Sequence, residues 1–107
     1  MGARAFLHSG NMGRRSIERK LRQVSSRLRS LREELRIADE QLAHLRDEAD
    51  DMSLRAMVAE TSHAGIEARR AQGHADAMAK HRAHLADSIA QLERTQDQLL
   101  DALTATP

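Results

Sequence analysis

Histidine and carboxylate side chains are the groups of this sequence that could do chemistry. Six histidines are present, and His81 and His84 have the i, i+3 spacing that a metal ion can use on a helix. No carboxylate completes a set with them on one helix face, so we expect no metal site. Neighbouring carboxylates, such as Glu33 and Glu34, point about 100° apart on a helix, which is typical of a solvated acidic surface and not of an acid–base pair.

The composition offers no enclosed place for catalysis. The chain has 107 residues, one aromatic residue, one proline and no cysteine, and its formal net charge is +1. Without large side chains to fill an interior, a buried catalytic cleft is not expected, and the glycines form no phosphate-binding loop. We therefore expect a protein that is not an enzyme and takes neither a cofactor nor a small-molecule substrate.

The elements that carry these residues are indicated by apolar residues recurring every three or four positions. A first seam runs through residues 17, 21, 24, 28, 31, 35, 38, 42, 45, 49, 52, 56 and 59, and a second through 64, 68, 71, 75, 78, 82, 85, 89, 92, 96, 99 and 103. Such spacing is typical of coiled-coil helices, with Leu21 at heptad position a and Val24 at d. The two seams are out of phase, so the helix must break or slip between Ala59 and Ala64.

The fold expected from these seams is all-α: an antiparallel two-helix coiled-coil hairpin, which could self-associate into a four-helix bundle. We predict an N-terminal tail over 1–13, a first helix over 14–60, a turn over 61–65, a second helix over 66–103 and a C-terminal tail over 104–107. The alternative is one continuous helix with a stutter, dimerising along its length.

A turn centred near residue 63 would place opposite one another residues whose numbers sum to about 126. Arg32 and Glu93 could then form an ion pair. Leu85, Ile89 and Leu92 would face Leu42, residues 37–38 and Leu35.

Two polar residues occupy a positions of the second seam. Arg82 and Gln96 are expected to fix the register of the helices, since a polar residue at a costs stability but specifies pairing. Arg82 would reach Asp47 or Glu48 across the hairpin, or extend outward to solvent.

Charge is distributed unevenly along the chain. Residues 1–36 carry ten basic and three acidic side chains, whereas residues 37–68 carry two basic and eight acidic side chains. Positions b, e and f of the first helix form an arginine ridge that consists of Arg15, Arg19, Arg22, Arg29, Arg32 and Arg36. This ridge could bind nucleic-acid phosphates without sequence preference, because no aromatic side chain accompanies it, or an acidic protein surface, or only solvent. The acidic band Asp39, Glu40, Asp47 and Asp50 on the same face could receive the ridge of another copy.

Apolar residues near the predicted turn are not explained by the seams. Leu54, Met57 and Val58 occupy outer positions of the first helix, and Ile66 occupies an outer position of the second. We interpret these four residues as a docking surface at the hairpin tip; alternatively, they cover the turn or meet the N-terminal tail.

Three segments of the chain, GRRSIERKLRQVSSRLRSLREEL (13–35), ADEQLAHLRDEADD (38–51) and HADAMAKHRAHL (74–85), together with fifteen Arg to two Lys, resemble small coiled-coil proteins of actinobacteria. This resemblance implies a bacterial origin, and it brings no assigned activity with it. No segment is apolar enough for a signal peptide or membrane span, so we expect a cytoplasmic protein without a membrane partner. The functional hypothesis is an adaptor or assembly module that binds a protein partner or itself as a homo-oligomer. The alternative is an accessory factor on a nucleic-acid or ribonucleoprotein machine.

Overall fold

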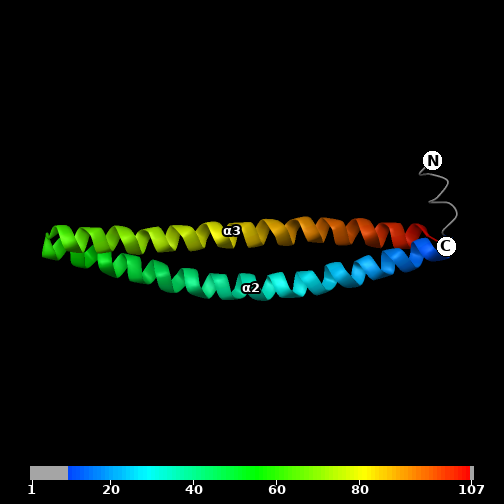
Figure 1. The fold of residues 1–107 in the computed structure, drawn as a ribbon, viewed down its shortest axis with the longest axis horizontal. Coiled ribbons are helices and arrows are strands. Elements are labelled where there is room, and N and C mark those ends of the chain that lie inside the picture. The colour runs from blue at the N-terminus through cyan, green and yellow to red at the C-terminus, as the bar shows by residue number, and fades with distance from the viewer. Residues whose placement is uncertain (1–9, 107) are drawn as a thin grey trace. The chain divides into compact units, whose positions relative to one another are not determined.

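The computed structural model describes residues 10–106, and two α-helices account for nearly all of them (Figure 1). Helix α2 spans Gly10–Ala59 and helix α3 spans Ser62–Ala105. The chain is an all-α helical hairpin, and no strand occurs between residues 10 and 106. Neither α2 nor α3 has a stretch long and apolar enough to cross a membrane.

The hairpin divides into two compact units, in each of which a segment of α2 packs against a segment of α3 (Figure 1). The terminal unit comprises residues 1–32 and 87–107, of which 10–32 and 87–106 are described. The turn unit comprises residues 33–86 and contains the connection between the helices.

The core of each unit consists of seam residues. Leu28, Leu31 and Ile89 are buried in the terminal unit, and the turn unit buries Ala38, Leu42, Ala49, Ala75 and Leu85. All other predicted seam positions are half-buried except Ala59, which is exposed. A narrow apolar stripe on each helix is therefore enough to hold the two helices together, as expected for residues that repeat at i, i+3 and i+4.

Only Glu60 and Thr61 connect the two helices. Glu60 has a left-handed backbone (φ 53°), and its N–H donates to the Ala56 carbonyl at 3.0 Å, which ends α2 in an αL cap. Thr61 then caps α3, because its Oγ1 accepts the N–H of Ala64 at 3.2 Å. The reversal rules out the alternative of one continuous helix. The turn predicted over 61–65 is thus too long: Ser62, Ala64 and Gly65 already lie in α3.

The outer ends of both helices extend beyond the predicted bounds. Helix α2 begins at residue 10 instead of 14, and α3 runs through residue 105 instead of 103. These end residues lack the apolar periodicity from which the helices were predicted. They are helical nevertheless, because each residue added to an existing helix gains a backbone hydrogen bond. Of the predicted tail 1–13, residues 10–13 are helical and the remainder lies outside the described residues, as does residue 107.

The short connection shifts the pairing of the helices. The hydrogen-bonded partners Asp39 and Arg82 have numbers that sum to 121, as do Ser25 and Gln96, and not to the expected 126 or so. Leu85 consequently lies level with residue 36, next to Leu35, and not opposite Leu42.

The same correction applies in the terminal unit. Ile89 and Leu92 lie level with residues 32 and 29, so their seam neighbours are Leu31 and Leu28. The sequence had predicted residues 37–38 as the partner of Ile89 and Leu35 as the partner of Leu92.

Candidate interaction surfaces of α2

Polar pairs connect α2 to α3 within the terminal unit. The predicted ion pair between Arg32 and Glu93 is confirmed, with Nη2 and Oε2 3.2 Å apart. Gln96 donates from Nε2 to the Ser25 Oγ at 3.2 Å, and this pair is partly buried. Because a partly buried amide costs free energy unless it is hydrogen-bonded, the Gln96–Ser25 pair favours this one register of the two helices.

In the turn unit, Arg82 has a different partner from the one predicted. Its Nε donates to Asp39 Oδ1 at 2.7 Å, and not to Asp47 or Glu48. The prediction failed because it used a turn centre more than two residues too late, which placed Asp47 instead of Asp39 near Arg82. An open depression of about 400 Å³ surrounds this ion pair, and small side chains, including Ala43 and Ala79, line it.

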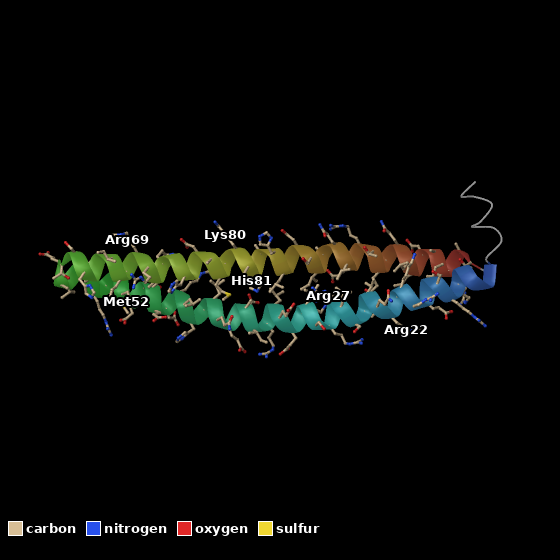
Figure 2. All side chains as sticks on the ribbon, viewed as in Figure 1. Arg22, Arg27, Met52, Arg69, Lys80 and His81 are labelled. Atoms are coloured by element: carbon tan, nitrogen blue, oxygen red, sulfur yellow. The ribbon has the colours of Figure 1, made fainter. Side chains whose placement is uncertain are left out.

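The six arginines of the ridge are all exposed, but they differ in their partners. Arg22 points away from α3 (Figure 2). Arg32 is held by Glu93, as described above. Arg36 lies between two glutamates, with Nη2 2.7 Å from Glu33 Oε1 and Nη1 2.7 Å from Glu40 Oε1.

These contacts of Arg36 change the titration of the groups involved. The hydrogen bond from Arg36 lowers the pKa of Glu33 from its ordinary value of 4.5, and both glutamates raise the pKa of Arg36. Arg36 is therefore already neutralised by its own helix. It also lies in the turn unit, whereas the other five ridge arginines lie in the terminal unit.

Four ridge arginines have no such partner. Within the described part of the chain, no carboxylate lies within 4.0 Å of the following side chains: Arg15, Arg19, Arg22 and Arg29. All four belong to the terminal unit. We call them the open ridge. They form the part of the predicted ridge that is available to an external anion or carboxylate.

The acidic band lies in the turn unit and is exposed throughout. Asp39 is bonded to Arg82, and Glu40 is bonded to Arg36. For Asp47 and Asp50, the structure from residue 10 to residue 106 shows no cationic partner within 4.0 Å. These two aspartates are the part of the band that is available to an external cation.

The apolar residues near the turn form a smaller surface than the sequence suggested. Leu54, Met57 and Val58 are 59%, 67% and 87% exposed, and their i, i+3, i+4 spacing places them together on the outer face of α2. We call these three residues the apolar cluster. Ile66 is 48% exposed, but its f position puts it on the outer face of α3, away from α2. The predicted tip surface is therefore split, with Ile66 separate from the cluster.

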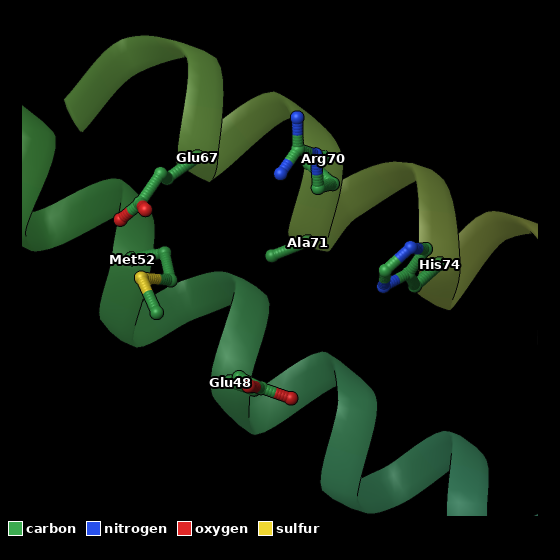
Figure 3. Close-up of a pocket in the computed structure, with 6 residues that line it drawn as sticks. All are labelled: Glu48, Met52, Glu67, Arg70, Ala71 and His74. Carbon is green, nitrogen blue, oxygen red and sulfur yellow. The ribbon is translucent and has the colours of Figure 1, made fainter. Parts of the chain in front are cut away.

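A small depression between the helices was not anticipated from the sequence. It arises where Ala71 of α3 faces Met52 of α2, because the alanine is too short to fill the space (Figure 3). Its rim consists of the exposed polar side chains Glu48, Glu67, Arg70 and His74. The depression has about 160 Å³, below the roughly 300–1,000 Å³ of typical small-molecule sites.

The five histidines among residues 10–106 are all exposed and are dispersed along the two helices. His81 and His84 are both exposed, and His63 contacts Glu67 at 3.2 Å. Among residues 10–106, no three His, Cys, Asp or Glu side chains are grouped so that they could hold a metal ion.

Charges of opposite sign face each other in both units. In the terminal unit, the α2 segment carries eight basic residues and one acidic residue, whereas the described α3 segment carries one basic residue and four acidic residues. In the turn unit the signs are reversed. The α2 segment has three basic and eight acidic residues, and the α3 segment has four basic and two acidic residues. Antiparallel pairing is thus favoured electrostatically in each unit.

Comparison with family models, with curated proteins and with solved structures finds no match for this chain. The exposed features of α2 that could carry a function are the open ridge, the acidic band and the apolar cluster.

Proposed function

We propose that the protein is a non-enzymatic adaptor, which assembles with a protein partner or with itself through the outer face of α2. The observation that carries this proposal is the apolar cluster. Positions on the outside of a two-helix hairpin are normally polar, and the preceding f positions of α2 in the turn unit are Glu33, Glu40 and Asp47. Leu54 breaks this pattern together with Met57 and Val58.

The size of the apolar cluster suggests an anchor within a larger interface. Covering the exposed fractions of its three side chains would contribute roughly 3–6 kcal/mol, at 1.5–3 kcal/mol for a fully buried aliphatic side chain. Association costs about 4–15 kcal/mol in lost freedom of motion, so the cluster alone cannot hold a partner. The neighbouring acidic band would have to contribute polar contacts around this apolar anchor, as is common at protein interfaces.

The test replaces Leu54 and Val58 by glutamate in one variant. Both side chains are exposed, so we expect the isolated chain to keep its helical circular dichroism and thermal stability. A buried interface, in contrast, would lose several kcal/mol on receiving two charges. Binding to co-purifying proteins from the native cell and the assembly size in sedimentation should both be measured.

The control for this test is Gln41→Glu with Ser53→Glu, which adds the same charge at exposed positions of the same unit outside the cluster. We expect only the Leu54/Val58 variant to lose a partner or an oligomer. Retention of every partner and of the same assembly size by that variant would refute a role of the cluster. Unfolding of the variant would show that these side chains stabilise the hairpin itself.

A second candidate function rests on the open ridge. Four exposed arginines without carboxylate partners suit the phosphates of DNA or RNA, and the absence of aromatic side chains between them favours contacts to the backbone over contacts to the bases. The protein would then act as an accessory factor on a nucleic-acid or ribonucleoprotein machine.

This candidate predicts a characteristic salt dependence. Replacing Arg15, Arg22 and Arg29 by glutamine should weaken binding to unrelated duplexes alike, and reduce the slope of log K against log salt by about 0.9 per lost contact. Fluorescence anisotropy with labelled duplexes measures this slope. Lys20→Gln with Arg27→Gln serves as the control, since both residues are exposed and lie outside the ridge. Equal affinity of wild type and ridge variant would exclude the nucleic-acid function.

A further inference from the structure

We infer that the open ridge of one copy of this chain binds the acidic band of a second copy, with the two α2 helices antiparallel. This inference rests on the proposed assembly function and names its partner. The hairpin leaves two charged surfaces exposed: Arg19 and Arg22 in the terminal unit, and Asp47 and Asp50 in the turn unit. None of these four side chains has an ion partner within 4.0 Å among the described residues.

The spacing of the two surfaces is the same when one of them is read backwards. The open ridge runs 15, 19, 22, 29, with steps of four, three and seven residues. From Leu54 of the apolar cluster, three residues of the acidic band follow backwards along α2. They are Asp50, Asp47 and Glu40, and the steps are again four, three and seven. Two antiparallel helices in this register place Arg19 level with Asp50, and Arg22 level with Asp47. Arg29 is level with Glu40, and Arg15 with Leu54.

Helix geometry makes this match meaningful. The ridge residues occupy b and f positions of α2, as do their partners, so both sets lie on the outer face that α3 does not cover. Each b residue of one copy meets an f residue of the other. Opposite charges then face each other at Arg19–Asp50, Arg22–Asp47 and Arg29–Glu40, and the aliphatic part of Arg15 lies over the exposed Leu54.

A second copy fits these surfaces better in antiparallel than in parallel orientation. In a parallel pair with equal residues level, arginine would face arginine along the ridge and carboxylate would face carboxylate along the band, which is repulsive. Because the paired residues are charged and exposed, the attraction must be strongly screened by salt: the Debye length falls from about 30 Å at 0.01 M to about 8 Å at 0.15 M. We therefore expect self-association that is strongest at low ionic strength.

The experiment is a charge swap measured by sedimentation equilibrium of the full chain in 10 mM and 150 mM salt. One variant carries Arg19→Glu with Arg22→Glu, and the other carries Asp47→Arg with Asp50→Arg. Each variant alone brings like charges together at the contact, so its self-association should be at least about tenfold weaker than that of wild type. An equimolar mixture of the two variants restores opposite charges at every such position and should restore association to the wild-type level.

Two further variants make the test specific. Lys20→Glu with Arg27→Glu changes the net charge by the same amount as the ridge variant but lies off the ridge, and it should associate like wild type. Leu54→Glu places a carboxylate level with Arg15, so self-association through the ridge and the band should persist or strengthen. A partner or an oligomer that is held by the apolar cluster should instead be lost. The self-pairing is thereby separated from the adaptor function, which the Leu54/Val58 variant tests.

Several outcomes would overturn the inference. They are a wild-type chain that stays monomeric at low salt, a ridge variant that associates like wild type, a control variant that loses association equally, and a mixture that fails to recover. Circular dichroism of each variant establishes that the hairpin is folded. A dimer would indicate that two copies make the contact reciprocally, and a ladder of larger species that copies join successively; both support the pairing of ridge and band.

Discussion

Replacing Glu60 by glycine should stabilise the hairpin, because Glu60 is held in a left-handed conformation (φ 53°) that side chains disfavour. An L residue with a side chain pays about 1–2 kcal/mol there, whereas glycine pays almost nothing. Glycine also makes the unfolded chain more flexible, which costs about 0.4–1 kcal/mol. The net expectation is that Glu60→Gly is about 1 kcal/mol more stable than Glu60→Ala.

The comparison with alanine is chosen because both variants remove the same carboxylate, which lies at the end of α2 and the start of α3. Urea unfolding followed by circular dichroism at 222 nm measures the difference, since the chain has no Trp or Tyr for fluorescence. About 1 kcal/mol corresponds to roughly 4–8 °C in Tm for a domain of this size.

Ala77→Gly provides the control of opposite sign. Ala77 is exposed and lies inside α3, where glycine should destabilise by about 0.5–1 kcal/mol. The explanation of the turn is refuted if Glu60→Gly is less stable than Glu60→Ala. That result would mean that residue 60 does not adopt the left-handed conformation in solution.

Three other perturbations test the remaining structural claims. Leu28→Ala removes the side chain that is 0% exposed in the terminal unit and should cost about 2–5 kcal/mol in urea unfolding. Thr61→Ala removes the N-cap of α3 and should cost about 1 kcal/mol, whereas Thr61→Ser should retain most of that stability. Arg36→Gln should return the pKa of Glu33 toward 4.5, as followed by NMR titration. Because the folded-state pKa of Glu33 is lowered, the stability due to this pair is present above pH 4.5 and is lost as the pH falls through the folded value.

The helices and their contact surfaces could be predicted from the sequence because burial in a two-helix hairpin follows one simple periodicity. Residues at alternating steps of three and four must share a helix face, and Leu28, Leu42 and Ile89 are indeed buried there. Exposure of the outer arginines and of Leu54 follows from the same geometry. These features depend on neighbours close in sequence, so no knowledge of the partner helix was needed.

The turn could not be placed from periodicity, because it depends on the backbone of two residues. Gly65 looks like the natural end of a helix, yet it lies in the first turn of α3, while Glu60 takes the left-handed position usually given to glycine. An error of a few residues at the turn shifted the expected pairings along the seam, although it left the predicted Arg32–Glu93 ion pair within reach. It was large enough to assign Arg82 to Asp47 or Glu48 instead of Asp39. Thr61 was the available signal, since a threonine three residues before Ala64 can cap the new helix.

The charge pattern explains why these weakly apolar helices pair in only one direction. Much of the seam is alanine, and only Leu28 among the larger side chains of residues 10–106 is fully buried, so shape alone discriminates poorly between registers. Each helix has a basic N-terminal half and an acidic C-terminal half; in the antiparallel hairpin, opposite signs therefore meet within both units. Pairing two helices in parallel would bring basic halves together and acidic halves together, at a cost that grows as salt is lowered. The same arrangement that selects the hairpin leaves Arg19, Arg22, Asp47 and Asp50 on the outer face of α2 without an ion partner within 4.0 Å among the described residues, and another molecule can pair with them there. Charge thus specifies folding between α2 and α3 and, on the opposite face, provides the complementarity from which self-assembly is inferred.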